Sequence, residues 1–343
     1  MIGGEVCSRL VAKGHRVFAL VHRNREVRGN DGRLVEASTV LQGDVTAPGF
    51  SLGEWEHSLD VIVHCAASLT FDAPEAELDA INVGGTSNAI ELARAHGASL
   101  LHVSTAYVCG MTDGRMTERP VPASTRFANG YEASKARAEA LVRDSGVPFV
   151  IVRPAIVLGD SASGAIRKFD AIYQAFAMIA RGLLRTMPVT PDATLDFVPI
   201  DHVAGGIVAL ACDMAKANGA TCHLTSGAPL PVADFAAAIG RYEQFHAPAL
   251  VSAEGFDPAT LPAIERRVFR SVAGAYASYF QRNPRFDDAV FRELTGLGEP
   301  QVGPAWMAKL IDYAIAEGLL PSERPDNVRA AASSRPAPIG SPP

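Results

Sequence analysis

The residues of this chain best suited to chemistry are Tyr131 and Lys135, together with Ser104 and Thr105 upstream. Tyr131 and Lys135 are four residues apart, so on a helix their side chains lie on one face with the ammonium near the phenol. A free phenol has a pKa of about 10, and a nearby cation lowers it by favouring the anion. Such a tyrosine acts as a proton donor or acceptor near neutral pH, and Thr105 would hold the carbonyl oxygen that it protonates.

Taken alone, this pair is equally consistent with a solvated helix face that carries a surface lysine. Its context favours chemistry, because the pair opens an Ala-rich helix and the preceding strand ends in Ser104 and Thr105. The set, with the flanking segments 101–110 and 152–159, resembles the extended branch of the short-chain dehydrogenase/reductase superfamily. The resemblance implies that Thr105, with Ser104 in reserve, Tyr131 and Lys135 are catalytic, and that Lys135 lowers the Tyr131 pKa and contacts the nicotinamide ribose.

The elements that must position these residues alternate between apolar strands and helices, which predicts an α/β fold with a doubly wound, Rossmann-like parallel sheet. Strands are expected at 16–21, 41–45, 60–64, 100–104, 147–153 and 222–224, and helices at 1–13, 74–96 and from Tyr131 onward. The expected domains are an NADP-binding domain of residues 1–160 and 190–227, a smaller, mostly helical substrate-binding lobe of 161–189 and 228–320, and a disordered tail at 321–343.

One part of this fold is missing from the sequence, namely its first strand and the glycine-rich turn after it. The chain begins Met1-Ile2-Gly3-Gly4, which matches only the end of the superfamily pattern Thr-Gly-x-x-Gly-x-x-Gly, with Gly3 in place of the last glycine. In that pattern the backbone amides hold the cofactor pyrophosphate at a helix N-terminus. We expect the true start to lie about ten or more residues upstream; the alternative is a short, inactive form.

The resemblance also implies further cofactor contacts. Arg23 follows the second strand of the superfamily fold, where a cation suits a 2′-phosphate and favours NADP over NAD, with Arg33 as a second contact; a solvated basic loop is the alternative. Asn82 is expected to brace the sheet. The other implied cofactor residues are Gly3, Asp44 and Val45 at the adenine, the small residues Cys65, Ala66 and Ala67, and Ser104, Tyr131, Lys135, Pro154 and Val157.

A narrower resemblance rests on segments 64–72, 153–160 with Gly164, and 196–201, which are similar to the thioester-reductase and fatty-acyl-CoA-reductase branch. It implies that an acyl thioester on CoA or a carrier protein is reduced with NADPH to an aldehyde or alcohol, with Tyr131 as proton donor. Two alternatives stay open. One is a sugar-nucleotide epimerase/dehydratase or a hydroxysteroid or ketone dehydrogenase on the same scaffold, and the other is an N-terminally truncated, non-catalytic relative.

Three further segments carry weaker expectations. The apolar stripe from Phe169 to Leu183 either packs the smaller lobe or lines a tunnel for an apolar substrate. Asp201 is expected to cap a helix that begins near His202. Segment 279–287 has no assigned chemistry.

The composition of the chain limits the classes of partner that it is expected to bind. A net charge of −6 argues against nucleic acid as a partner. The chain has no run of about 18 uncharged apolar residues, so no membrane-spanning helix is expected. The five scattered cysteines indicate reduced thiols and a cytoplasmic protein. The sequence has no CxxC or HxxxH spacing, so a metal site is not expected. The expected partner is a small-molecule or carrier-bound acyl substrate, and the resemblance adds a homodimer formed through helices near Tyr131.

Overall fold

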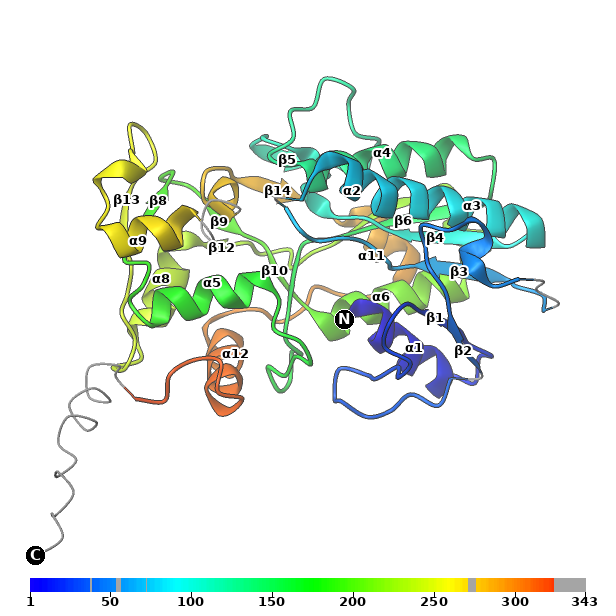
Figure 1. Ribbon diagram of the computed structural model, residues 1–343, viewed down its shortest axis with the longest axis horizontal. Coiled ribbons are helices and arrows are strands. Elements are labelled where there is room, and N and C mark those ends of the chain that lie inside the picture. The colour runs from blue at the N-terminus through cyan, green and yellow to red at the C-terminus, as the bar shows by residue number, and fades with distance from the viewer. Residues whose placement is uncertain (38, 54–56, 72, 271–275, 324–343) are drawn as a thin grey trace, which may run out of the picture.

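A four-stranded parallel sheet forms the centre of the computed structural model, which describes residues 1–37, 39–53, 57–71, 73–270 and 276–323 (Figure 1). The strand order is β11-β6-β4-β3. The strands are β3 (Val61–His64), β4 (Ser99–Val103), β6 (Phe149–Pro154) and β11 (Thr221–Leu224). Leu100 and Leu101 of β4 are both fully buried although they point to opposite faces, so the sheet is covered on both sides.

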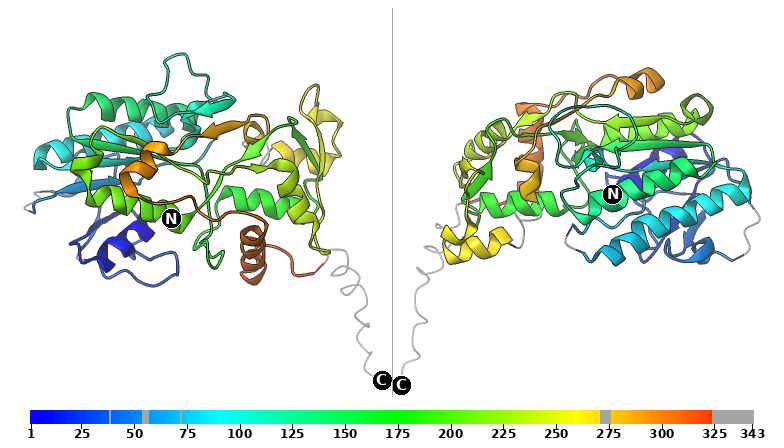
Figure 2. Two further views of the ribbon diagram at one scale, coloured as in Figure 1. Left: turned by 180° about the vertical axis from the view of Figure 1, so that it is seen from behind. Right: turned by 90° about the horizontal axis from the view of Figure 1, so that it is seen from above.

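Helices cover the two faces of this sheet. On one face lie α3 (Gly85–His96) and α4 (Gly130–Asp144), and on the other lie α6 (Ile200–Cys212) and α11 (Ala289–Thr295) (Figure 2). A short helix, α2 (Glu75–Leu78), leads into α3 through a π-helical turn, Asp79–Gly84. The helix predicted at 74–96 is therefore present, but its winding changes in the middle.

Two further strands, β1 (Phe18–Val21) and β2 (Thr39–Gln42), form a separate parallel pair beside α1 (Ile2–Ala12). Leu20 of β1 and Ile62 of β3 pack against the same apolar cluster, so one hydrophobic core joins the two sheets. Within the described residues, no strand is hydrogen-bonded between β1 and β3. In the described chain, β1 and β2 therefore form a parallel sheet of their own.

The second lobe lies at the other end of the molecule, on the left in Figure 1, and contains strands as well as the predicted helices. Its helices are α5 (Ala171–Ala180), α8 (Val232–Gly240), α9 (Ala263–Val268) and α12 (Pro304–Ala316), and its strand pairs are β8 (Thr186–Val189) with β13 (Ala249–Ser252) and β9 (Thr194–Leu195) with β12 (Leu230–Pro231).

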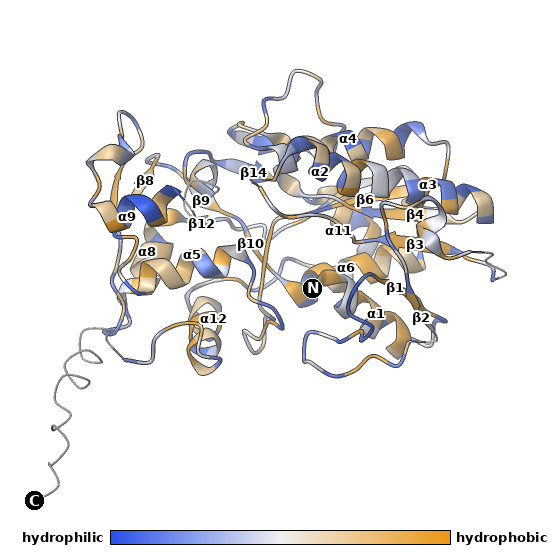
Figure 3. Ribbon diagram, in the orientation of Figure 1, coloured by the Kyte–Doolittle hydropathy of each residue, from blue (hydrophilic) through white to orange (hydrophobic). Residues whose placement is uncertain are grey.

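Several short elements complete the fold. They are the parallel pairs β7 (Ile156–Leu158) with β10 (Phe197–Pro199) and β5 (Gly114–Met116) with β14 (Pro284–Phe286), the helix α7 (Met214–Ala217), and the 3₁₀ turns Pro48–Ser51, Ala106–Cys109, Pro258–Thr260 and Ala277–Phe280. One continuous apolar cluster runs from Val152 of β6 and Ile207 of α6 to Phe235 of α8 and Trp306 of α12. The strands and inner helix faces are correspondingly hydrophobic in Figure 3.

Asp201 departs from its predicted role. Helix α6 begins at Ile200 with Pro199 at the N-cap, so Asp201 lies inside the first turn and does not cap it. Its carboxylate instead accepts hydrogen bonds from the backbone N–H (2.8 Å) and hydroxyl (2.7 Å) of Ser161, and so holds the loop after β7 against α6. A Pro–x–Asp sequence leaves the helix start uncertain by one or two residues, which is where the prediction failed.

Residues 324–343, most of the predicted tail, lie outside the described residues. Among those that are described, no helix is both long and apolar enough to cross a bilayer. All five cysteines are free thiols.

Candidate active site

Strand β4 delivers the two candidate hydroxyls to one edge of the sheet. Ser104 and Thr105 follow its last residue directly, and both are buried. Thr105 is extended, and its hydroxyl accepts a hydrogen bond from the N–H of Tyr107 at 3.3 Å, which begins a 3₁₀ turn. The Thr105 hydroxyl also lies close enough to the Tyr131 phenol to lower the pKa of the phenol. The structure thus brings together the two hydroxyls that the sequence paired.

Tyr131 and Lys135 lie in the first turns of α4, whose start is fixed by a side-chain cap. The Asn129 side chain accepts a hydrogen bond from the N–H of Glu132 at 2.9 Å. Tyr131 is 7% exposed and Lys135 only 1%. Their shared face therefore packs against the sheet, which excludes a solvated helix face with a surface lysine.

The Lys135 amine is directed into the sheet. It donates to the carbonyl oxygen of Val103 at 2.7 Å, and its Nζ lies 3.2 Å from Nε2 of His102. Burial lowers the pKa of Lys135 to about 8, against the opposing effect of Glu139. Burial likewise lowers the pKa of His64 to about 3, so this imidazole stays neutral beside the lysine. The charge of Lys135 is therefore only marginally favoured at neutral pH.

The Tyr131 phenol does not have the predicted low pKa. Burial and the Glu132 carboxylate raise its pKa above the ordinary value, and the neighbouring Thr105 hydroxyl lowers it only in part. The four-residue spacing places Lys135 on the correct face, but its amine bonds to the carbonyl of Val103. The protein residues alone therefore keep Tyr131 protonated, which is the state of a proton donor.

Two buried ion pairs hold α4 in place. Arg153 of β6 donates two hydrogen bonds, of 2.6 Å and 2.8 Å, to the carboxylate of Glu139. Near the start of the helix, Arg282 donates to Glu132 at 2.5 Å, and its guanidinium stacks 4.8 Å from the ring of Tyr107. Arg282 comes from the segment to which the sequence assigned no chemistry. Its partner is 150 residues earlier, so no local spacing would have revealed the pair.

The residues expected at the pyrophosphate lie where α1 meets β3. Cys65, Ala66 and Ala67 follow β3 directly, and Ala66 is exposed. A Cβ on Gly3 would lie 3.5 Å from Cβ of Cys65, so the N-terminal turn of α1 sits directly over the end of β3. Burial raises the pKa of Cys65 to about 12, so this thiol stays protonated.

The residues expected at the adenosine follow β1 and β2. Arg23 is exposed beyond β1. Asp44 accepts hydrogen bonds from the N–H (2.9 Å) and hydroxyl (2.8 Å) of Thr46, which lower its pKa, so it also closes a turn. The carbonyl of Val45 accepts from Asn88 at 2.8 Å. Arg33 is strongly exposed and lies 3.5 Å from Asp31.

The remaining candidates lie on the same side of the sheet or support it. Pro154 ends β6, and Val157 lies in β7. Asn82 is fully buried and bonds to the backbone of Ser68 and, at 2.9 Å, to the hydroxyl of Ser134 in α4. Its predicted bracing role is confirmed. Among the described ranges, no group of His, Cys, Asp or Glu side chains is arranged to hold a metal ion.

A parallel sheet with a hydroxyl pair and a lysine at its edge defines a class: the chain is an NAD(P)-binding reductase of the extended short-chain dehydrogenase/reductase type. Residues 10–207 match the family described as male sterility protein, and the chain belongs to this family. The first resemblance inferred from the sequence is thereby confirmed.

Individual relatives are much longer proteins. The chain is 30% identical over 226 residues to the hybrid PKS-NRPS synthetase pvhA of Talaromyces variabilis, a match that covers 61% of this chain and 5% of that protein. It is 33% identical over 213 residues to a linear gramicidin synthase polypeptide of Brevibacillus parabrevis, covering 57% of this chain and 4% of that protein. The chain therefore spans only a small part of the length of these relatives.

Among solved structures, the terminal R domain from the myxalamid PKS-NRPS biosynthetic pathway superimposes with a TM-score of 0.77. The sequence identity is 22%, and the superposition covers 94% of this chain and 90% of that domain. The likeness confirms the α/β parallel-sheet fold across almost the whole chain.

Proposed function

We propose that this protein reduces an acyl thioester, carried by CoA or by a carrier protein, with NADPH. The observation that carries the proposal is the buried pair of Thr105 and Tyr131, whose hydroxyls interact, with Lys135 one turn further along the same buried helix face. The relatives named above include a gramicidin synthase and the terminal R domain of a PKS-NRPS pathway. Both names fit a substrate that is tethered through a thioester.

The dinucleotide has a suitable place at this edge of the sheet. Ala66 presents no more than a methyl group there, and Nε2 of the buried neighbour His64 has no hydrogen-bond partner among the described residues. Gly3, the segment 65–67 and Ser104 would lie along the pyrophosphate and nicotinamide, and Asp44 and Val45 near the adenine. The exposed Arg23 would pair with a 2′-phosphate, which favours NADP over NAD.

When bound, the reduced nicotinamide supplies the hydride that adds to the thioester carbonyl carbon. Tyr131, kept protonated by burial, donates its phenolic proton to the carbonyl oxygen, and Thr105 holds that oxygen by a hydrogen bond. The resulting hemithioacetal expels the thiol and leaves an aldehyde. Lys135, on the same buried helix face but bonded to the Val103 carbonyl, would contact the nicotinamide ribose.

The same proposal assigns the two parts of the chain. Residues 1–160 and 190–227 would bind the dinucleotide, and residues 161–189 and 228–320 would form the substrate lobe, except that α11 packs on α6 and β11 and so belongs to the first part. Packing of Tyr131 against Phe71, whose ring lies 5.3 Å away, and of Phe71 against Tyr276 of the second lobe supports a substrate site between them. A homodimer formed through helices near Tyr131 stays a prediction.

The test is NADPH oxidation with a panel of acyl-CoA and acyl-pantetheine thioesters, run beside NADH, UDP-sugars and hydroxysteroids. Tyr131→Phe should lower kcat at least about 100-fold, the scale of general acid catalysis. The matched control is Tyr242→Phe, because the Tyr242 hydroxyl bonds to Asp312 on α12, away from the site. Turnover of UDP-sugars or steroids without thioester reduction, or a Tyr131→Phe enzyme of normal activity, would refute the proposal.

A further inference from the structure

A buried histidine lies against the lysine of the candidate active site and has no role in the chemistry described so far. His102 is in β4, two residues before Ser104, and its side chain is fully buried. It lies on the sheet face that α4 covers, because its Nε2 is 3.2 Å from Nζ of Lys135 in that helix. Its other ring nitrogen, Nδ1, has no hydrogen-bond partner among the described residues.

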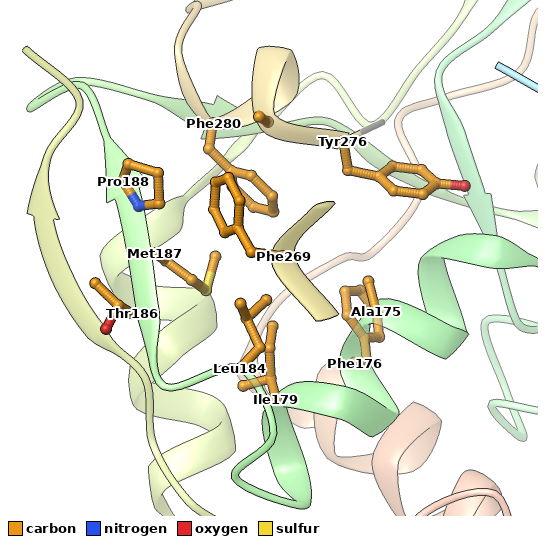
Figure 4. A pocket seen from close by; sticks show the side chains of 11 residues that line it. Ala175, Phe176, Ile179, Leu184, Thr186, Met187, Pro188, Phe269, Tyr276 and Phe280 are labelled. Carbon is orange, nitrogen blue, oxygen red and sulfur yellow. The ribbon is translucent and has the colours of Figure 1, made fainter. Parts of the chain in front are cut away.

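Packing alone does not explain an imidazole at this position. A buried ring nitrogen without a partner is destabilising, because it has lost its hydrogen bonds to water. Elsewhere the interior is filled by apolar side chains: between α5, β8 and Phe280, residues such as Phe176 and Met187 pack together (Figure 4). A leucine side chain would fill the place of His102 without an unpaired nitrogen. The contribution of His102 therefore lies in Nε2 and in what that atom does for Lys135.

The donors of Lys135 show what this nitrogen does. A protonated lysine amine has three N–H groups and no acceptor. One N–H donates to the carbonyl oxygen of Val103 at 2.7 Å, and a second faces Nε2 of His102. In the part of the chain that the structure describes, Nζ has no third partner. The third N–H is thus left for a bound ligand.

This arrangement requires a neutral His102 with its proton on Nδ1, because only a free lone pair on Nε2 can accept from an ammonium. Burial lowers the pKa of His102 well below its ordinary value, and the charge of Lys135 lowers it further. The hydrogen bond that Nε2 accepts favours the charged form of the lysine.

Other titratable groups near the Lys135 amine act on it differently. The Glu139 carboxylate, one turn along α4, raises the pKa of the lysine and so opposes burial. His64 and Cys65 are uncharged, since burial lowers the pKa of the first to about 3 and raises that of the second to about 12. Among these groups, His102 is the one that is bonded to the amine.

We infer that His102 is a positioning residue for Lys135: its Nε2 holds one N–H of the amine, keeps the amine charged, and leaves the third N–H for a hydroxyl of the nicotinamide ribose. The inference rests on the proposed function, because the ribose belongs to the dinucleotide placed at this edge of the sheet. His102 acts only through the lysine, since its ring is fully buried.

Two substitutions of His102 and one of its neighbour test this role. His102→Leu removes the acceptor, whereas His102→Gln keeps one, because the glutamine amide oxygen can take the place of Nε2. His64 is the cross-strand neighbour of His102 in β3, with ring centroids 5.6 Å apart, and its Nε2 has no partner among the residues described. His64→Leu is therefore the matched control for the acidity of the lysine. Thermal unfolding checks that each variant is folded.

The first measurement is NMR of protein labelled in lysine and histidine, without substrate or dinucleotide. The Lys135 signal, identified by its loss in Lys135→Met, should titrate with a pKa of about 8 in the wild type. His102→Leu should make this amine about tenfold more acidic, the effect of losing one hydrogen bond to a charged group. His102→Gln and His64→Leu should leave its acidity within about twofold of the wild type. The nitrogen shifts of His102 should show the proton on Nδ1.

The second measurement is NADPH binding at a series of pH values. The dissociation constant of the wild type should rise above about pH 8, where Lys135 loses its charge. In His102→Leu the rise should begin about one pH unit lower, and His102→Gln should restore the wild-type profile. A residue that served packing alone would change stability without moving this profile.

A proton on Nε2 of His102, or an unchanged Lys135 titration in folded His102→Leu, would overturn the inference, as would an equal change in His64→Leu. The tautomer is measured in the wild type, so it decides the question even where His102→Leu does not fold. Lysine titration and NADPH binding that respond to His102→Leu in a protein that reduces no thioester would support the inference while refuting the proposed function.

Discussion

Replacing Lys135 by methionine should make the protein more stable at neutral pH while it destroys activity. Burial lowers the pKa of this amine from 10.5 to about 8, which at about 1.4 kcal/mol per pKa unit means that its charge costs about 3 kcal/mol at pH 7. Methionine has a similar unbranched stem and no charge. It leaves the Val103 carbonyl without its 2.7 Å hydrogen bond, a loss of about 1 kcal/mol.

The net expectation is a gain of about 2 kcal/mol in the free energy of unfolding at pH 7, or roughly 4 °C in Tm. The gain should disappear at high pH. Because the folded pKa of Lys135 is below the unfolded one, the unfolded chain binds more protons between pH 8 and 10.5, and wild-type stability rises across that window. Near pH 10 the two proteins should be about equally stable.

Urea unfolding of wild type, Lys135→Met and the exposed-site control Lys13→Met, at pH 7 and pH 10, measures these differences. The control should follow the wild type at both values, since Lys13 is exposed at the end of α1. The reasoning that the buried Lys135 ammonium destabilises the wild type would be refuted by either of two results. Lys135→Met could be less stable than the wild type at pH 7, or it could show the same rise in stability between pH 8 and 10. In activity assays the wild type should be active and Lys135→Met inactive.

Two further predictions concern buried charges. Arg282→Met should lower the free energy of unfolding by about 3–5 kcal/mol because it strands the buried Glu132 carboxylate, and the double variant with Glu132→Gln should recover more than half of that loss in urea unfolding; equal losses in the single and double variants would contradict the pairing. Burial raises the pKa of Asp196 to about 6, so the folded chain binds more protons than the unfolded chain between pH 4 and 6, and stability should fall as pH rises through that window; Asp196→Asn should flatten this dependence, and a slope that persists in the variant would refute it.

The sequence was sufficient for the features that repeat locally. Apolar runs identified the strands of the central sheet, and the spacing of Tyr131 and Lys135 correctly placed both on one buried face. It was not sufficient for the direction of a long side chain, because the same spacing is compatible with an amine beside the phenol or, as found, against the Val103 carbonyl. The direction of the Tyr131 pKa was wrong for this reason.

Side-chain pairs between residues far apart in the sequence could not be predicted from local sequence patterns. Glu132 has the position of an ordinary first-turn acid that complements the helix dipole, and only the folded chain brings Arg282 to it. Similarly, Asp201 has the residue type of a helix cap, but its oxygen atoms are used by Ser161, 40 residues earlier. In both cases the partner is selected by the tertiary fold, while local sequence specifies only that a partner is needed.

The division of the sheet has a consequence for how the molecule opens. Strands β1 and β2 share backbone hydrogen bonds with each other, but the described chain shows no such ladder to β3, so side-chain contacts such as that of α1 on α6 carry the attachment. Amide hydrogens of β1 and β2 should then exchange through a separate opening of lower free energy than that of β4 and β6. Such an opening would carry Arg23 and Asp44 away together, so exchange in this segment reports directly on whether a dinucleotide bridges the two sheets.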